Sequence, residues 1–155
     1  MEHSELRPPT LLALPSYLAG HVARIGHRQL AAALAEHDLR LPHFAVLTGL
    51  SDFGPLAQHD IADRLGLQRP HLVGYIDQLQ RHGLVQRERD PQDRRRQRVA
   101  LTPVGTRLVR QLTKVAGASQ DDLLVGLSEA ERDTLTALLR RVVSADDAAR
   151  TGVTT

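Results

Sequence analysis

The chain has 155 residues, 41% of them hydrophobic, and a formal net charge of +2 from 20 basic and 18 acidic side chains. This length fits a single domain, or one domain shared across a dimer. The sequence contains no cysteine, which excludes disulfides, thiolate metal sites and cysteine nucleophiles. It also lacks an apolar run of the roughly 20 residues that would span a membrane, and it begins without the apolar segment of an export signal. We therefore expect a cytoplasmic protein with no membrane contact.

Arginine dominates the basic residues, since Lys114 is the single lysine. Arginine suits bidentate contact with phosphate and guanine. A GC-rich genome would produce the same overall bias, but it would not explain why arginines cluster in one part of the chain.

Helical periodicity dominates the N-terminal part. Residues 1–13 are polar and contain two consecutive prolines, which is typical of a flexible arm. Apolar residues recur at helical spacing over residues 16–37, which predicts a first helix. Pro42 suits the first turn of a second helix over residues 43–50. A Gly-Pro pair within residues 51–56 ends that helix.

A helix-turn-helix and a hairpin follow. A short helix over residues 58–65 ends at a glycine, and a second amphipathic helix over residues 69–82 has a proline in its first turn. Two alternating segments, 85–89 and 97–101, predict antiparallel strands joined by a loop over residues 90–96. This order is that of a winged helix-turn-helix, in which one helix enters the DNA major groove and a basic loop lies beside it.

Two further helices complete the expected architecture. Thr102 and Pro103 begin a helix that extends to Leu127, with a kink at Gly117 as an alternative, and Ser128 opens a capping box for a last helix. The expected fold class is mainly α, a winged helix-turn-helix with flanking helices that form a dimerisation region. The expected divisions are a flexible arm at 1–13, N-terminal helices for dimerisation and an effector pocket at 14–50, the DNA-binding lobe at 51–102, C-terminal dimerisation helices at 103–148, and a flexible tail at 149–155.

The second helix of the helix-turn-helix buries Leu72, Ile76 and Leu79, so its opposite face is expected to contact DNA. Its N-terminus also offers free amide protons to a phosphate. Six arginines crowd the hairpin, three of them consecutive at its tip, and they repel one another unless an anion such as a narrow minor groove neutralises them. A solvated helix face and a basic turn paired with its own aspartates are the alternative. The expected DNA-contacting residues are Gln68, Arg69, Pro70, His71, Tyr75, Gln78, Arg94, Arg95 and Arg96.

The segments LAQHDIADRLGL and RPHLVGYIDQLQRHGLVQRERDPQDRRRQRVALTPVG resemble the DNA-binding core of the multiple antibiotic resistance regulator (MarR) family. The resemblance implies a homodimeric winged-helix repressor. Its specific part is Asp93 with Arg95 ahead of VALTPVG, which implies that Asp93 orders the wing and that Arg95 reaches DNA. Ala57, His71 and Gly74 depart from the family pattern, so the operator sequence does not follow from the resemblance.

A polar stripe on the first predicted helix is a candidate effector site, joined by two residues that open the next helix. An arginine beside histidine and tyrosine suits a carboxylate or phenolate that carries an aromatic ring. The resemblance implies that small aromatic acids bind between the dimerisation helices and the DNA-binding lobe. A solvated helix face or intersubunit hydrogen bonds are the alternative. The candidate effector residues are Tyr17, His21, Arg24, Arg28, His43 and Phe44.

We expect no metal, no cofactor and no enzyme activity. The eight histidines form no HxxxH pair in a predicted helix, and no nucleophile motif or paired carboxylates stand out. The sequence predicts a homodimeric transcriptional repressor that binds a pseudo-palindromic operator in double-stranded DNA and is released by a small anionic aromatic effector. A winged-helix module for protein contacts, and an activator without a small-molecule effector, are the alternatives.

Overall fold

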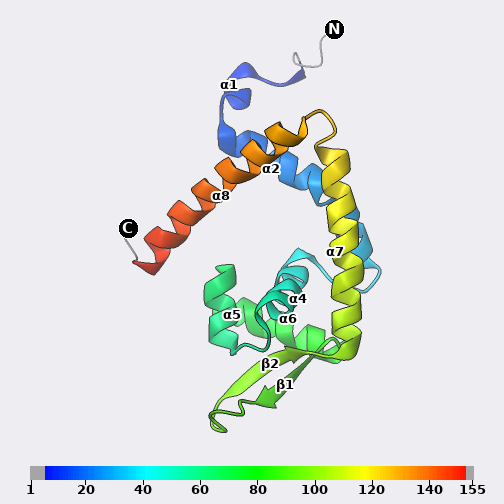
Figure 1. The fold of residues 1–155 in the computed structure, drawn as a ribbon, viewed down its shortest axis with the longest axis vertical. Helices are drawn as coiled ribbons and strands as arrows, with labels where there is room; N and C mark the ends of the chain where they lie inside the picture. The colour runs from blue at the N-terminus through cyan, green and yellow to red at the C-terminus, as the bar shows by residue number, and fades with distance from the viewer. Residues whose placement is uncertain (1–5, 153–155) are drawn as a thin grey trace. The chain divides into compact units, whose positions relative to one another are not determined.

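The computed structural model describes residues 6–152 and is mainly helical (Figure 1). Its contacts divide the chain into two compact units, Met1–Ser119 and Gln120–Thr155. The expected fold class, a mainly α winged helix-turn-helix, is confirmed. Within the described range, every helix is too short or too polar to span a membrane. In chain order the elements are α1 (Pro9–Leu12), α2 (Pro15–Gly26), α3 (Arg28–Ala35), α4 (Leu41–Phe53), α5 (Gln58–Leu65), α6 (Arg69–Arg81), β1 (Val85–Arg89), β2 (Gln97–Leu101), α7 (Pro103–Leu123) and α8 (Glu129–Thr151).

The orientation of α6 is fixed by the burial of one face. Leu72, Ile76 and Leu79 recur at helical spacing, and each is 1% exposed or less. α6 packs against α4, α5 and β1, and its buried face joins the core cluster that includes Leu47 and Ile61. Full burial of one such aliphatic side chain contributes about 1.5–3 kcal/mol. The three side chains together therefore determine which face of α6 remains exposed.

The wing is an antiparallel hairpin in which β1 and β2 pair over residues 85–89 and 97–101. Leu56 adds a bridge to this hairpin. Its N–H donates to the Val99 carbonyl oxygen at 3.1 Å, and the Val99 N–H donates back to the Leu56 carbonyl oxygen at 2.7 Å. The sequence placed Leu56 in a helix-breaking loop and did not predict this pairing, because a single bridge leaves no periodic pattern. The bridge ties the hairpin to the segment between α4 and α5.

The start of α7 is docked on the turn between α6 and β1. The Thr102 N–H donates to the Leu84 carbonyl oxygen at 3.0 Å, and the Thr102 hydroxyl donates to the Gly83 carbonyl oxygen at 2.6 Å. The same hydroxyl oxygen accepts the Gly105 N–H at 3.1 Å. A β-carbon on Gly105 would lie 2.0 Å from the Leu84 carbonyl oxygen. The close approach therefore requires glycine at this position.

The N-terminal helices differ from expectation in three ways. The helix expected over residues 16–37 is two helices, α2 and α3, which are interrupted at His27 directly after Gly26. Glycine weakens a helix interior, which accounts for a break at this point. α1 forms one helical turn inside the arm that was expected to be flexible. α4 continues to Phe53, because the left-handed stop is Gly54 with φ 78°.

α7 is helical without interruption through Gly117, the position at which the sequence allowed a kink. It ends at Leu123, four residues before the expected end at Leu127. The predicted capping box of α8 is confirmed. The Glu131 N–H donates to the Ser128 hydroxyl oxygen at 3.2 Å, and the Ser128 N–H donates to the Glu131 carboxylate at 2.8 Å.

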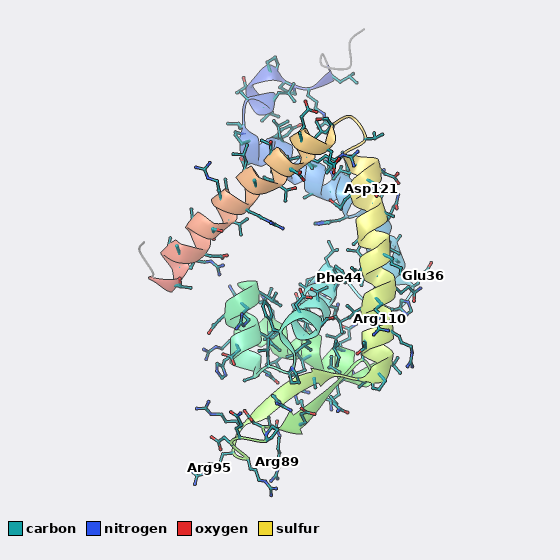
Figure 2. All side chains as sticks on the ribbon, in the orientation of Figure 1. Glu36, Phe44, Arg89, Arg95, Arg110 and Asp121 are labelled. Carbon is teal, nitrogen blue, oxygen red and sulfur yellow. The ribbon has the colours of Figure 1, made fainter. Side chains whose placement is uncertain are left out.

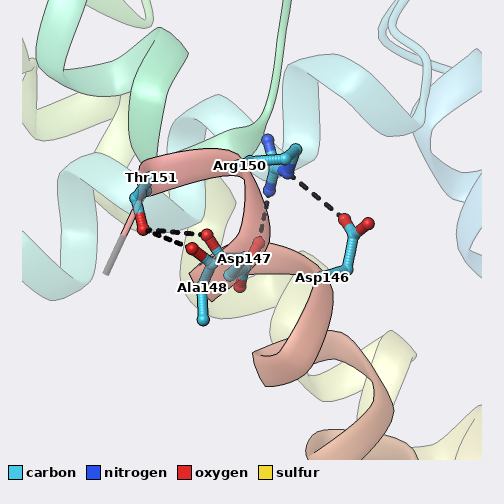
Figure 3. Close-up of polar contacts among 5 residues, drawn as sticks. All are labelled: Asp146, Asp147, Ala148, Arg150 and Thr151. Atoms are coloured by element: carbon cyan, nitrogen blue, oxygen red, sulfur yellow. Dashed lines mark hydrogen bonds and ion pairs between the residues drawn. The ribbon is translucent and has the colours of Figure 1, made fainter. Parts of the chain in front are cut away.

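The last turn of α8 makes polar contacts and extends to Thr151, although the sequence predicted a flexible tail from residue 149 (Figure 3). Arg150 forms ion pairs with Asp146, at 3.2 Å between Nε and Oδ2, and with Asp147. The Thr151 hydroxyl donates to the Asp147 carbonyl oxygen at 2.9 Å. Basic side chains in the last helical turn also interact favourably with the helix dipole. Residues 1–5 of the expected arm and 153–155 of the expected tail lie outside the described residues.

Replacing Gly105 by alanine should lower the free energy of unfolding by about 1–3 kcal/mol, because the new β-carbon would press on the Leu84 backbone oxygen. Gly117 is a matched control on the same helix, since a β-carbon there meets nothing within 4 Å. Gly117→Ala should stabilise the protein by up to about 1 kcal/mol. Urea unfolding of both variants measures the difference. Equal stability of the two variants would contradict the docking of α7 described above.

Candidate nucleic-acid interface

The first turn of α6 is a polar surface that is open to an anion. Gln68, Arg69, Pro70 and His71 are all exposed. Gln68 precedes the helix and makes no side-chain cap hydrogen bond, and the first amide to bond back within the helix is that of Leu72, to the Gln68 carbonyl oxygen. The amides before Leu72 therefore lack intrahelical acceptors. Free amides and the helix dipole favour a phosphate at this end.

Two residues expected on this DNA-contacting face, Tyr75 and Gln78, make contacts within the protein that the sequence did not predict. The Gln78 carboxamide is bonded to the His43 ring at 3.0 Å and donates to the Asp38 carbonyl oxygen at 2.8 Å. Tyr75 is half-buried and packs edge-on against His43, with 5.1 Å between the ring centroids, while the Arg40 guanidinium lies over its ring. The segment before α4 thus covers the C-terminal half of the predicted reading face. Both polar atoms of the Gln78 side chain are thus engaged in hydrogen bonds within the protein.

The tip of the hairpin is organised by Asp93. Its carboxylate accepts the Arg95 N–H at 3.1 Å and pairs with the Arg96 guanidinium, with 3.6 Å between Oδ2 and Nε. The Asp90 carboxylate in turn accepts the Gln92 N–H at 2.9 Å. Asp90 and Asp93 thus each accept a backbone amide within the loop that joins β1 and β2. Figure 2 shows Arg95 at the outer end of the hairpin.

The hairpin arginines divide into paired and unpaired groups. Arg87 bridges to Asp77 on α6 at 2.6 Å, and Arg98 pairs with Glu88 across the hairpin at 2.7 Å. By contrast, Arg89, Arg94 and Arg95 form no ion pair within residues 6–152. The paired arginines hold the hairpin together and to α6. The unpaired group leaves concentrated positive charge near the tip, which favours binding of a polyanion.

A cleft of about 590 Å³ lies between α5, the start of α6 and the hairpin. Among the described residues, its lining contains no carboxylate. Such a cleft can hold a nucleic-acid backbone, because arginine binds phosphate with two parallel hydrogen bonds. Its polar lining includes Gln58, His59, Arg69, Arg87, Arg96 and Arg98.

The polar stripe on α2 forms a real side-chain cluster. Tyr17 and His21 pack edge-on, with 4.5 Å between ring centroids, and His21 Nδ1 is bonded to the Arg24 guanidinium. Arg7 donates to the Tyr17 hydroxyl at 3.3 Å. Partial burial, followed by the nearby Arg7 and Arg24 guanidinium groups, lowers the pKa of His21. The cluster therefore combines two guanidinium groups with an imidazole and a phenol.

The other three candidate effector residues do not join this cluster. Arg28 is exposed at the start of α3 and makes no polar contact within the described residues. His43 is fully buried between α4 and α6, and Phe44 packs against the hydrophobic core. Arg7 was not predicted, because it lies in the arm that was expected to be flexible. No group of three or more potential metal ligands gathers in the part of the chain that the structure describes.

An exposed helix N-terminus beside a hairpin with unpaired arginines defines a winged-helix DNA-binding protein. Comparison with known proteins agrees: the MarR family model matches residues 39–96. The chain is 30% identical over 103 residues to a putative transcriptional regulatory protein for the hcr operon of Thauera aromatica, a match that spans 66% of this chain and 62% of the length of that relative.

Two solved structures match over nearly the whole chain. The PcaV transcriptional regulator of Streptomyces coelicolor, in complex with its natural ligand, is 30% identical with a TM-score of 0.74, covering 90% of this chain and 99% of PcaV. BpsR of Bordetella bronchiseptica is 26% identical with a TM-score of 0.75, covering 88% of this chain and 98% of BpsR. The protein belongs to the MarR family and is a DNA-binding transcriptional regulator.

Removing the unpaired tip arginines should weaken DNA binding without unfolding the protein. Arg95→Ala should cost about 1–3 kcal/mol of affinity for a specific operator, because it removes a contact in the groove. Arg94→Ala should weaken binding to all DNA sequences. It should also reduce the slope of log affinity against log salt concentration by about one for each phosphate that is no longer neutralised. Arg110→Ala on α7, an exposed arginine outside the cleft, is the charge-matched control. Fluorescence anisotropy across a salt series measures these effects, and an Arg95→Ala variant that binds the operator like the parent would exclude the wing as a reader.

Proposed function

We propose that this regulator is a homodimeric repressor that binds a pseudo-palindromic operator and is released from it by a small aromatic or phenolic acid. The observation that carries the DNA-binding part is the combination of the open α6 N-terminus with unpaired arginines at the hairpin tip. In a dimer these surfaces are duplicated, and winged-helix dimers bind half-sites about one helical turn, or about 10 base pairs, apart.

Dimerisation is supported by apolar surface that each unit leaves exposed. In the first unit, an apolar stripe follows α2, and in the second unit α8 contains no buried residue. Exposed apolar stripes of this length are unfavourable in water, and a second copy of the chain would cover them through a symmetric interface. The first stripe consists of Leu14, which precedes α2, and Leu18, Val22 and Ile25 on α2, and these residues are 40–47% exposed. The second consists of Leu138, Leu139, Val142 and Val143 on α8, which are 46–70% exposed.

The effector class is supported by the chemistry of the α2 cluster. Two guanidinium groups attract a carboxylate, and the Tyr17 and His21 rings offer aromatic contact beside it. PcaV is described in complex with a natural ligand, and BpsR has its DNA binding regulated by 6-hydroxynicotinic acid, a hydroxylated aromatic acid. A similar ligand class fits the cluster here.

Sedimentation should show a dimer at micromolar concentration. Val142→Asp should shift it towards the monomer, because a carboxylate would be buried in the apolar interface at a cost of several kcal/mol. Ser144→Asp adds the same charge to the opposite face of α8 and should leave the dimer intact. A parent protein that sediments as a stable monomer would contradict the proposed assembly.

Selection of genomic fragments by the purified protein should yield an operator, and the proposed repressor should release it when benzoate-like or salicylate-like acids are titrated. Coupling of about 1–3 kcal/mol would weaken operator binding 5- to 150-fold. Arg24→Ala should abolish this release, because it removes one of the two cations of the α2 cluster. Arg28→Ala, outside the cluster, should retain it. If both variants release the operator to the same extent, the assignment of the α2 cluster as the effector site is contradicted. The proposed DNA binding is not affected by that result.

A further inference from the structure

His43 is a histidine in the interior of the first unit, and both of its ring nitrogens are bonded. Its exposure is 0%. Nδ1 accepts the Arg40 backbone N–H at 2.9 Å, and Nε2 lies 3.0 Å from the Gln78 Oε1. Because Nδ1 is the acceptor, the proton of the neutral ring is on Nε2, which donates to Gln78. His43 thus caps the start of α4 and contacts the middle of α6 at the same time.

Gln78 extends this contact into a chain of three hydrogen bonds. Its Nε2 donates to the Asp38 carbonyl oxygen at 2.8 Å. Asp38 lies in the turn between α3 and α4 and adopts a positive φ of 55°, which is uncommon for a residue other than glycine. These three hydrogen bonds link the turn before α4, the first turn of α4 and α6, which is the recognition helix. They are the polar counterpart of the apolar packing that orients α6.

We propose that His43 and Gln78 are positioning residues for DNA binding, in which the neutral His43 holds α6 in its DNA-binding orientation and protonation of His43 releases it. Acidification would then lower operator affinity. This inference rests on the proposed operator binding and adds regulation of that binding by pH, which requires no effector.

Protonation of His43 would break this series of hydrogen bonds at Nδ1. A proton on Nδ1 would face the Arg40 N–H, so that two donors meet and the backbone amide loses its acceptor. An unpaired buried donor costs about 1–3 kcal/mol. The new charge would also be buried beside the Arg40 guanidinium, which itself lies over the Tyr75 ring.

The surroundings of His43 favour its neutral form. Burial is the largest cause that lowers its pKa, and the charges of Arg40 and His82 lower it further, while the bond to Gln78 opposes them in part. Arg40 precedes α4, and Tyr75 and His82 belong to α6 and its C-cap. α3, α5 and β2 also pack against α4, but in the described part of the chain they place no charged group that shifts the ring.

The lowered pKa sets the sign of the pH effect. The stabilisation that depends on neutral His43 is fully present above the ordinary histidine pKa of about 6.5, and it is lost as the pH falls through the lower pKa of the folded protein. Exposed histidines near DNA have the opposite effect, since their protonation adds positive charge and strengthens binding. Comparison of matched variants separates the two contributions.

The test is the affinity of the full-length protein for its selected operator, measured by anisotropy at constant ionic strength between about pH 8 and about pH 5. For the parent, affinity should fall on acidification, approaching tenfold per pH unit for each subunit that takes up one proton. His43→Gln should bind like the parent near pH 8 and lose this fall, because glutamine at the third helical position can accept the capping N–H and its amide can donate to Gln78. His27→Gln, an exposed histidine between α2 and α3 and outside the DNA-binding surface, is the control and should retain the fall.

A second variant should flatten the pH profile. Gln78→Glu places a carboxylate against Nε2, which stabilises the protonated ring in the α6 orientation described here, so acidification should lower operator affinity less than in the parent. A parent affinity that is unchanged or strengthened by acid would overturn the inference, as would a fall that persists unaltered in His43→Gln and Gln78→Glu. Absence of any selected operator near pH 8 would contradict the proposed function instead. Thermal unfolding without DNA still tests His43, because the parent should lose more stability on acidification than His43→Gln does.

Discussion

Burial of one face of α6 is the constraint on which the rest of the DNA-binding surface depends. Leu72, Ile76 and Leu79 are removed from water together, and this fixes the rotation of the helix about its axis. The exposed N-terminal turn, its free amides and Arg69 then necessarily face outward. The hairpin follows directly from the end of the same helix, and Arg87 joins it back to α6 through Asp77. The buried stripe therefore positions the recognition helix, and the wing is joined to the same lobe by the Arg87–Asp77 ion pair, the Leu56–Val99 bridge and the buried Val85 and Val99 side chains.

Ion pairing separates the arginines that support the fold from those at the hairpin tip. Where an arginine supports the architecture, it has an acidic partner, as Arg98 has in Glu88. At the tip, Arg94 and Arg95 are left without such partners in the described chain, while the Asp93 carboxylate is engaged by the backbone and by Arg96. Mutual repulsion among unpaired arginines is tolerated in the free protein and relieved when a polyanion binds. We propose that these unpaired arginines supply part of the affinity for DNA.

Elements with a strong local pattern were predictable from the sequence. The amphipathic period of α6, the alternation of the hairpin strands and the Ser128 capping box all appear where expected. What could not be predicted depends on contacts between distant residues. Gln78 belongs to the same polar stripe of α6 as His71, but His43, 35 residues earlier, claims its carboxamide. Likewise, Arg7 joins Tyr17 only because α1 and α2 pack together. Periodicity identifies faces, and only tertiary contacts show which part of a face stays open.

A crystal structure of the dimer bound to its selected operator would show whether α6 and the hairpin tip together form the DNA-binding surface. The expectation is that the first turn of α6 lies in the major groove, that the hairpin tip with Arg94 and Arg95 lies along the adjacent minor groove or its phosphates, and that Gln78 keeps its bond to His43. A complex in which Gln78 leaves His43 to contact a base, or in which the hairpin tip points away from the DNA, would contradict it.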